Sequence, residues 1–190
     1  MFSPWQAIVA AQKVADAEQA KSTGGMVALY PRTDYAQQLH IPGGEPVQDM
    51  HVTMAYLGED VTGSDPGGIS QGLDQICSSY TVIDARVMGH ATFNGDGGPN
   101  GDMDPCAVYL ISDSEQMDNL HRDILDLCTQ QYNLPQQHAP WLPHLTAGYG
   151  VDANMLDYHG PILFDRIGFK FAGRSHVFPL LGSTSTEDID

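Results

Sequence analysis

The chain has 190 residues, of which 42% are hydrophobic and 17% are charged. This length and balance are typical of one globular domain with its own core, and they argue against a disordered chain or a fibrous rod. The 24 acidic residues outnumber the 8 basic ones and give a formal net charge of -16. Such a surface repels nucleic-acid backbones and anionic lipids, so we expect neither duplex DNA nor a membrane as partner. A short nucleotide held in one local pocket remains compatible with this charge.

The sequence predicts a cytoplasmic protein. No apolar run reaches the roughly 18–20 residues that a transmembrane helix needs, and the first residues lack the basic start and apolar stretch of a signal peptide. The three cysteines, Cys77, Cys106 and Cys128, are odd in number, widely spaced and without a CxxC pair. This pattern indicates reduced, buried thiols rather than a disulfide framework or a zinc site.

Residues 1–25 are predicted to form a leader helix ahead of the main domain. The stretch 3–21 is rich in Ala, with Ser3 as N-cap, Pro4 at the first helical position and Gln6 closing a capping box. We expect this segment to be a docking arm or an oligomer contact, because nothing in it suggests chemistry.

Residues 26–181 alternate between short β-like and helix-like runs. Apolar, β-branched or aromatic runs predict strands, and apolar residues that recur every three or four positions predict helices. The expected strands are 26–30, 50–57, 81–93, 107–111, 144–149, 162–172 and 175–180, and the expected helices are 33–40, 69–79 and 114–132. Because the last strands form hairpin-like pairs, an α+β fold is favoured over a doubly wound parallel sheet. Residues 182–190 are small, polar and acidic, which predicts a frayed tail.

Two segments repeat one pattern of chemistry-bearing residues. HVTMAY begins at His51 and HLTAGY begins at His144, so each has a Thr two positions and a Tyr five positions after the His. Since side chains alternate along a strand, His and Thr face one side together. The same rule sends Tyr56 and Tyr149 to the opposite face, where we expect them in the core.

Chance does not account for this repeat. With 8 His and 10 Thr in the chain, random placement gives about 0.4 His-x-Thr triplets, and three are found. The third, which starts at His90, runs directly into the turn sequence FNGDG and has no Tyr at the matching offset. We interpret it as a coincidence or a structural histidine.

The segments HVTMAYLGE and WLPHLTAGY resemble the two signature motifs of the 2H phosphoesterase superfamily, which includes 2′-5′ RNA ligase-like proteins and cyclic nucleotide phosphodiesterases. They are most similar to bacterial and bacteriophage members, and a phage-encoded chain would act in the host cytoplasm. The resemblance covers about residues 26–180. It implies a bilobed fold in which two pseudo-symmetric antiparallel sheets with flanking helices surround a central cleft. Each lobe is then expected to contribute one motif strand and one of the helices 69–79 and 114–132.

The resemblance implies that His51 and His144 are the catalytic pair. One imidazole accepts a proton while the other donates one, so the chemistry calls for no metal and no other cofactor. Thr53 and Thr146 are expected to donate hydrogen bonds to the phosphate. The expected substrates are small nucleotides or short oligonucleotides with 2′,3′-cyclic phosphates, 2′-5′ linkages or cyclic linkages. The sequence leaves open which histidine is the acid.

Base recognition is assigned to Trp141 and Tyr30, whose rings are candidates for stacking on a nucleobase. One or two cations of the domain are expected to neutralise the phosphate, without a choice among Arg32, Arg86, Arg166, Lys170 and Arg174.

Two other functions stay open. One is a non-catalytic nucleotide- or protein-binding module of phage head assembly, with a protein partner bound through the N-terminal helix. The other is a counter-defence nuclease that degrades cyclic oligonucleotide signals. A metal site in the loop 94–104 is disfavoured, because this Asp/Gly-rich loop lacks the closing Glu of an EF-hand.

Overall fold

A computed structural model describes residues 22–97, 104–112 and 114–183, so the predicted leader helix and most of the acidic tail lie outside it. The helices are α2 (Thr33–Leu39), α3 (Gly67–Cys77) and α4 (Glu115–Gln131), with short 3-10 helices η1 (Val47–Asp49) and η2 (Ala153–Met155). The strands are β1 (Gly25–Pro31), β2 (Val52–Gly58), β3 (Ile83–Phe93), β4 (Cys106–Ile111), β5 (His144–Tyr149), β6 (Gly160–Phe171) and β7 (Arg174–Pro179). Every strand and helix predicted within these ranges is present.

The strands of the described chain form one antiparallel sheet in the order β2-β1-β6-β3-β4-β5, with β7 also paired to β6. The α+β class is therefore confirmed. The two lobes are halves of a continuous sheet, because β6 is long enough to serve both. Its residues 160–164 pair with β3, whereas residues 164–171 pair with β1 and residues 166–171 with β7.

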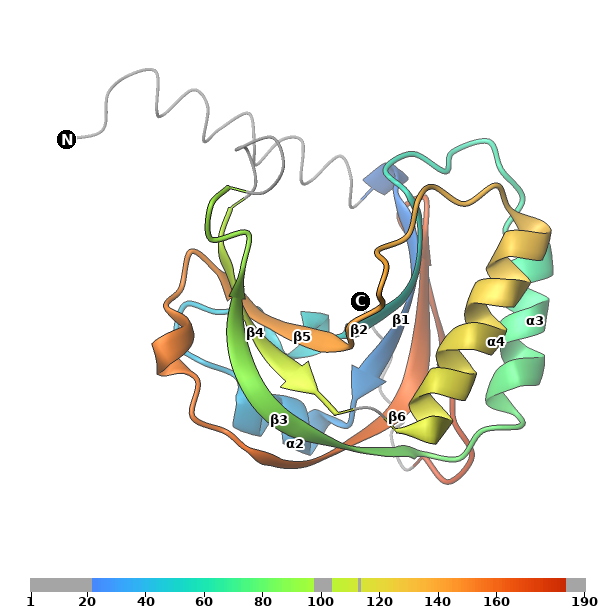
Figure 1. The fold of residues 1–190 in the computed structure, drawn as a ribbon. Coiled ribbons are helices and arrows are strands. Elements are labelled where there is room, and N and C mark those ends of the chain that lie inside the picture. The colour runs from blue at the N-terminus through green and yellow to red at the C-terminus, as the bar shows by residue number, and fades with distance from the viewer. Residues whose placement is uncertain (1–21, 98–103, 113, 184–190) are drawn as a thin grey trace, which may run out of the picture.

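The sheet curls so that its two edge strands, β2 and β5, approach each other across the hollow side (Figure 1). These are the two strands that carry the His-x-Thr motifs. A backbone hydrogen bond of 2.8 Å from Glu45 N to Ala147 O joins the connection before β2 to β5. The curvature thus brings together two motifs that lie far apart in the sequence.

Helices α3 and α4 pack against each other and cover the outer face of the β2-β1-β6-β7 half (Figure 1). The expectation of one of these helices per lobe is wrong. Their close approach depends on Gly72, where an added Cβ would lie 2.3 Å from a Leu127 methyl carbon. On the other half the short helix α2 is held to β4, where the Tyr109 hydroxyl donates to Leu39 O at 2.9 Å.

Helix α4 shows how the sequence sets its own boundaries. The Ser114 hydroxyl caps the first turn by accepting a 3.0 Å hydrogen bond from Met117 N. Met117, Leu120, Ile124 and Cys128 recur at helical spacing and are fully buried. Burying each large apolar side chain contributes about 1.5–3 kcal/mol, so this face fixes the helix on the sheet.

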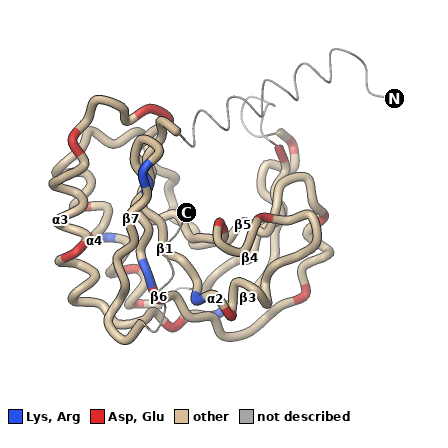
Figure 2. Tube along the Cα trace, turned by 180° about the vertical axis from the view of Figure 1, so that it is seen from behind, with Lys and Arg blue, Asp and Glu red and all other residues tan. Residues whose placement is uncertain are grey.

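The cysteines are buried and unbridged, as expected. Burial raises the pKa of Cys77 and of Cys128 to about 12, which keeps both as thiols. Acidic residues are scattered over helices, loops and strands (Figure 2). Lys170 lies on β6 and Arg174 on β7. Within the described ranges no helix has both the length and the apolar character needed to cross a membrane.

Candidate active site

Both motif strands contain a β-bulge directly after the Thr. In β2, Thr53 pairs with Ala28 but Ala55 pairs with Val27, so Met54 is an extra residue. Met54 and Ala55 are consequently both buried, and the alternation of faces is reset. Tyr56 is 38% exposed, so its predicted place in the core is wrong.

The second motif strand repeats this geometry. In β5, Thr146 pairs with Val108 and Gly148 with Ala107, which leaves Ala147 as the extra residue. Tyr149 is turned to the same side as His144 and is 59% exposed. Its predicted core position is therefore also wrong, and the bulge is the physical reason.

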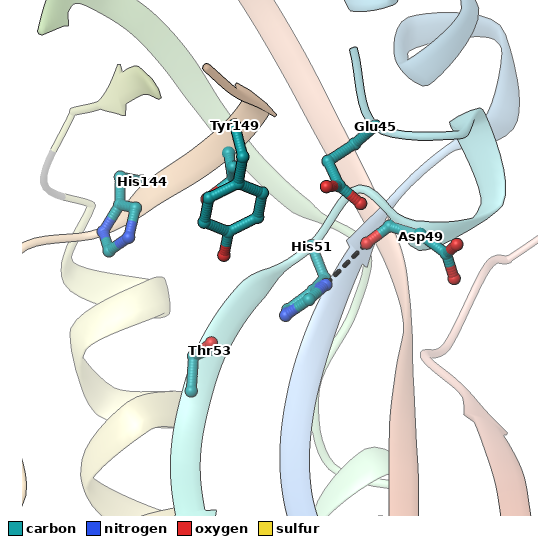
Figure 3. A pocket seen from close by; sticks show the side chains of 7 residues that line it. Glu45, Asp49, His51, Thr53, His144 and Tyr149 are labelled. Atoms are coloured by element: carbon teal, nitrogen blue, oxygen red, sulfur yellow. Dashed lines mark hydrogen bonds between the residues drawn. The ribbon is translucent and has the colours of Figure 1, made fainter. Parts of the chain in front are cut away.

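A pocket of about 170 Å³ opens between the motif strands (Figure 3). The structure brings the four predicted residues His51, Thr53, His144 and Thr146 to this single pocket. The described residues that line it are Glu45, Asp49, His51, Thr53, His144, Thr146 and Tyr149. Two histidines and two hydroxyls are thus offered to one small ligand.

The two histidines are held by matching hydrogen bonds. His51 Nδ1 lies 2.6 Å from Asp49 O, and His144 Nδ1 lies 2.7 Å from Leu142 O. A backbone carbonyl only accepts, so each Nδ1 must carry the proton and donate it. In each neutral ring, Nε2 therefore carries the lone pair, which is the atom needed for acid-base work.

An aromatic ring supports each histidine. The Tyr30 ring lies 5.6 Å from the His51 ring, and the Phe93 ring lies 4.8 Å from the His144 ring. Tyr30 is 1% exposed, so it has no free ring face, and its predicted stacking on a nucleobase is wrong. Burial also raises the pKa of the Tyr30 phenol well above its ordinary value. Tyr30 is a neutral support beneath His51.

His51 is biased toward its neutral form. Burial lowers the pKa of its imidazole below the ordinary value, and the positive charges of Lys170 and His144 lower this pKa further. The carbonyl and carboxylate of Asp49 act in the opposite direction without reversing the shift. A neutral His51 with a free Nε2 is suited to accept a proton near pH 7.

Trp141 joins the two motifs instead of facing a substrate. Its Nε1–H donates to Thr53 O at 3.1 Å, and its ring is stacked on His121 with centroids 3.8 Å apart. Trp141 does not line the pocket, so its predicted role in base stacking finds no support in the geometry. Gln137, in the same connection, bonds both N and O of Tyr56. The connection ahead of β5 is thereby fastened to the edge of β2.

None of the candidate cations lines the described pocket. Arg166 is buried and paired with Asp165 at 2.8 Å. Lys170 is the candidate cation whose charge acts on His51. Its Nζ lies 3.7 Å from an Asp49 carboxylate oxygen. His90, from the third triplet, also lies outside the pocket lining, and its Nε2 donates to Tyr158 O at 2.8 Å, as expected of a structural histidine.

Sequence reasoning missed Glu45, Asp49 and Tyr149. Tyr149 was visible in the repeat, but the alternation rule placed it on the wrong face. Glu45 and Asp49 belong to a connection without a motif, and its only signal is the pair of glycines before Glu45. Within the described residues, no three His, Cys, Asp or Glu side chains form a group that could hold a metal ion.

A curled antiparallel sheet that brings one His-x-Thr segment from each end to a single pocket is the arrangement expected of a 2H phosphoesterase. A family model described as the 2′-5′ RNA ligase superfamily matches residues 15–172. The chain belongs to this superfamily, the 2H phosphoesterases.

Solved structures share the fold. The protein TT0787 of Thermus thermophilus is 17% identical, with 84% of this chain and 99% of that chain covered and a TM-score of 0.60. LigT of Escherichia coli, in complex with 3′-AMP, is 15% identical, with 83% and 95% covered and a TM-score of 0.51. No curated protein matches the chain.

Proposed function

We propose that the chain is a phosphodiesterase that opens nucleotide 2′,3′-cyclic phosphates or cleaves 2′-5′ or cyclic oligonucleotide linkages by two-histidine acid-base catalysis. Membership of the superfamily supports phosphodiester chemistry. The observation that carries the proposal is the matched pair of Nδ1 hydrogen bonds on His51 and His144, which leaves two Nε2 atoms for one pocket.

In the proposed hydrolysis, His51 is the base. Its Nε2 takes a proton from water as the water oxygen bonds to phosphorus, and the lowered pKa of His51 keeps this nitrogen unprotonated at neutral pH. His144 acts as the acid in its imidazolium form and gives its Nε2 proton to the ribose oxygen as the bond between this oxygen and phosphorus breaks. The product is a phosphomonoester, and one further proton exchange with water restores both histidines.

Thr53 and Thr146 are placed to serve the phosphate. Both line the pocket, two positions after their histidines: Thr53 lies on β2, which begins directly after His51, and Thr146 lies on β5 together with His144. Their hydroxyls supply neutral donors for the non-bridging oxygens, whose negative charge grows in the transition state.

The test is hydrolysis of a panel of 2′,3′-cyclic nucleotides, 2′-5′ dinucleotides and cyclic dinucleotides with EDTA present. Wild type is compared with His51→Ala, His144→Ala and the matched control His90→Ala, which alters the third triplet. We expect turnover of at least one class, lost in the first two variants and kept in the control. No turnover of any class, or turnover that survives both motif substitutions, would overturn the proposal.

A further inference from the structure

The connection 132–143, which links α4 to β5, follows the outer edge of β2 (Figure 1). Among the described strands β2 pairs only with β1, so its other edge presents backbone groups that need partners. Two side chains of the connection, those of Gln137 and Trp141, supply partners for this edge. Side chains thus take the place that the backbone of a neighbouring strand usually has.

The Gln137 amide imitates a residue of a paired strand. Tyr56 N donates to its Oε1 at 3.0 Å, and its Nε2 donates to Tyr56 O at 2.9 Å. The same Nε2 also donates to Pro135 O at 2.8 Å. The amide therefore uses its acceptor and both of its donor hydrogens, a set that only an amide side chain offers.

Trp141 extends this attachment to the first motif. Its Nε1–H donates to Thr53 O at 3.1 Å, and its ring stacks on His121 of α4, with centroids 3.8 Å apart and planes 4° apart. The next residue, Leu142, has a carbonyl that accepts the 2.7 Å hydrogen bond from His144 Nδ1. The Leu142 side chain is 42% exposed, so its own packing does little to fix this carbonyl. The position of the carbonyl depends on the residues on either side.

On its other side the Leu142 carbonyl is followed by Pro143, which is buried. The Pro143 carbonyl accepts a 3.0 Å hydrogen bond from Ile111 N of β4. This anchor belongs to the same half of the sheet as His144. Trp141 is the anchor that ties the Leu142 carbonyl to β2, and hence to the other motif.

We propose that Gln137 and Trp141 are positioning residues that act on His144 through the Leu142 carbonyl. The inference rests on the proposed function, in which His144 is the acid. Both residues lie outside the described pocket lining, so neither is assigned a contact with the substrate. By holding the connection on the edge of β2, they keep Nδ1–H of His144 bonded and its Nε2 directed into the pocket beside Thr53.

The physical argument is geometric. A general acid must lie within hydrogen-bond reach of the oxygen that it protonates, and a misplacement of about 1 Å can lower the rate about 100-fold. The neutral His144 ring left after proton transfer carries its remaining proton on Nδ1 because the Leu142 carbonyl accepts it. The tautomer of His144 therefore reports where this carbonyl lies. Because Thr53 stays paired to β1, the effect falls on kcat rather than on KM.

The kinetic experiment uses two substrates, a 2′,3′-cyclic nucleotide and bis(4-nitrophenyl) phosphate, whose leaving group needs no acid. Wild type is compared with Gln137→Met, which keeps the length and removes the amide, and with Trp141→Phe, which removes the Nε1–H. Gln116→Met is the matched control, because Gln116 also donates from Nε2 to a backbone carbonyl, that of Thr81 at 3.3 Å, and lies outside the described pocket lining. Thermal unfolding verifies that each variant is folded.

The second readout needs no substrate. Nitrogen-15 NMR of the histidine rings gives the tautomer of neutral His144, with His144→Ala identifying its signals. We expect the Nδ1–H form in wild type and in Gln116→Met, and an increased share of the Nε2–H form in Gln137→Met and Trp141→Phe.

For the rates, we expect Gln137→Met and Trp141→Phe to lose about 10- to 100-fold in kcat on the cyclic nucleotide, with KM little changed. Both should stay close to wild type on the activated diester, and Gln116→Met should match wild type on both substrates. Equal losses on the two substrates, or an unchanged His144 tautomer in folded variants, would overturn the inference. Failure of the proposed function would instead appear as a wild type that turns over no phosphodiester, and the tautomer comparison does not depend on turnover.

Discussion

Removing the charge of Lys170 should raise the pKa of His51. The positive charge of Lys170 disfavours the imidazolium, so its loss favours protonation of His51. Lys170 also pairs with the Asp49 carboxylate at 3.7 Å. Without this pairing, the negative charge of Asp49 stabilises the His51 imidazolium more strongly. Both effects of Lys170→Gln therefore have the same sign.

The size of this shift follows from the exposure of the ion pair. The Lys170 and Asp49 side chains are 31% and 27% exposed, and partly exposed pairs are worth roughly 0–1 kcal/mol. A free energy of 1 kcal/mol corresponds to about a fivefold factor, so Lys170→Gln should raise the ratio of protonated to neutral His51 by up to about fivefold. The pH dependence of kcat/KM should move with it, since the base must be neutral: activity falls at pH 6 and is unchanged at pH 8.

Histidine ring resonances followed by NMR over pH measure the shift directly, and the pH profile of kcat/KM gives the functional reading. Lys170→Arg keeps the charge and is expected to leave both unchanged. The reasoning is refuted if the His51 pKa in wild type lies at or above 6.5, or if Lys170→Gln leaves it constant or lowers it.

Three other predictions concern the stability of the folded protein. Gly44→Ala places a Cβ 2.3 Å from a carbonyl oxygen of β5 and should lower the free energy of unfolding by roughly 1–3 kcal/mol; a midpoint equal to that of wild type in urea would contradict the close approach. Trp141→Phe keeps an aromatic ring but removes the Nε1–H that donates to Thr53 O and part of the stack on His121, so a loss of at least about 1 kcal/mol is expected by chemical denaturation, and no loss would argue against this link. Because burial lowers the pKa values of His51 and His121, the unfolded chain takes up protons first and stability should fall as pH drops below about 6.5; unfolding free energies that stay constant from pH 7 to pH 5 would contradict this.

The elements and the four motif residues could be predicted because their signals are local. The apolar periodicity of α4 and the repeated His-x-Thr triplets are properties of short segments. The faces of Tyr56 and Tyr149 could not be predicted, because one bulge residue after each Thr inverts the alternation that the prediction used. A bulge depends on the register with a neighbouring strand, and that register is a long-range property.

The same limit explains why the sequence did not reveal the supporting roles of Tyr30 and Trp141. Tyr30 and Trp141 are aromatic residues near the motifs, and the sequence does not distinguish a ring that faces a ligand from one that supports a histidine or closes a strand edge. Glu45 reaches the pocket only because Gly44 and Gly148 let a loop touch β5. Contacts between segments about 100 residues apart leave no periodic signal in the chain.

The claim that His51 is the base and His144 the acid is tested most directly by a substrate whose leaving group needs no proton. The measurement compares hydrolysis of bis(4-nitrophenyl) phosphate with that of a 2′,3′-cyclic nucleotide in wild type, His51→Ala and His144→Ala. General acid-base groups typically contribute about 10²–10⁴-fold. We predict that His51→Ala loses this factor on both substrates, whereas His144→Ala loses it only on the cyclic nucleotide and stays close to wild type on the activated diester. Equal losses for both variants on both substrates, or the reverse pattern, would contradict the assignment.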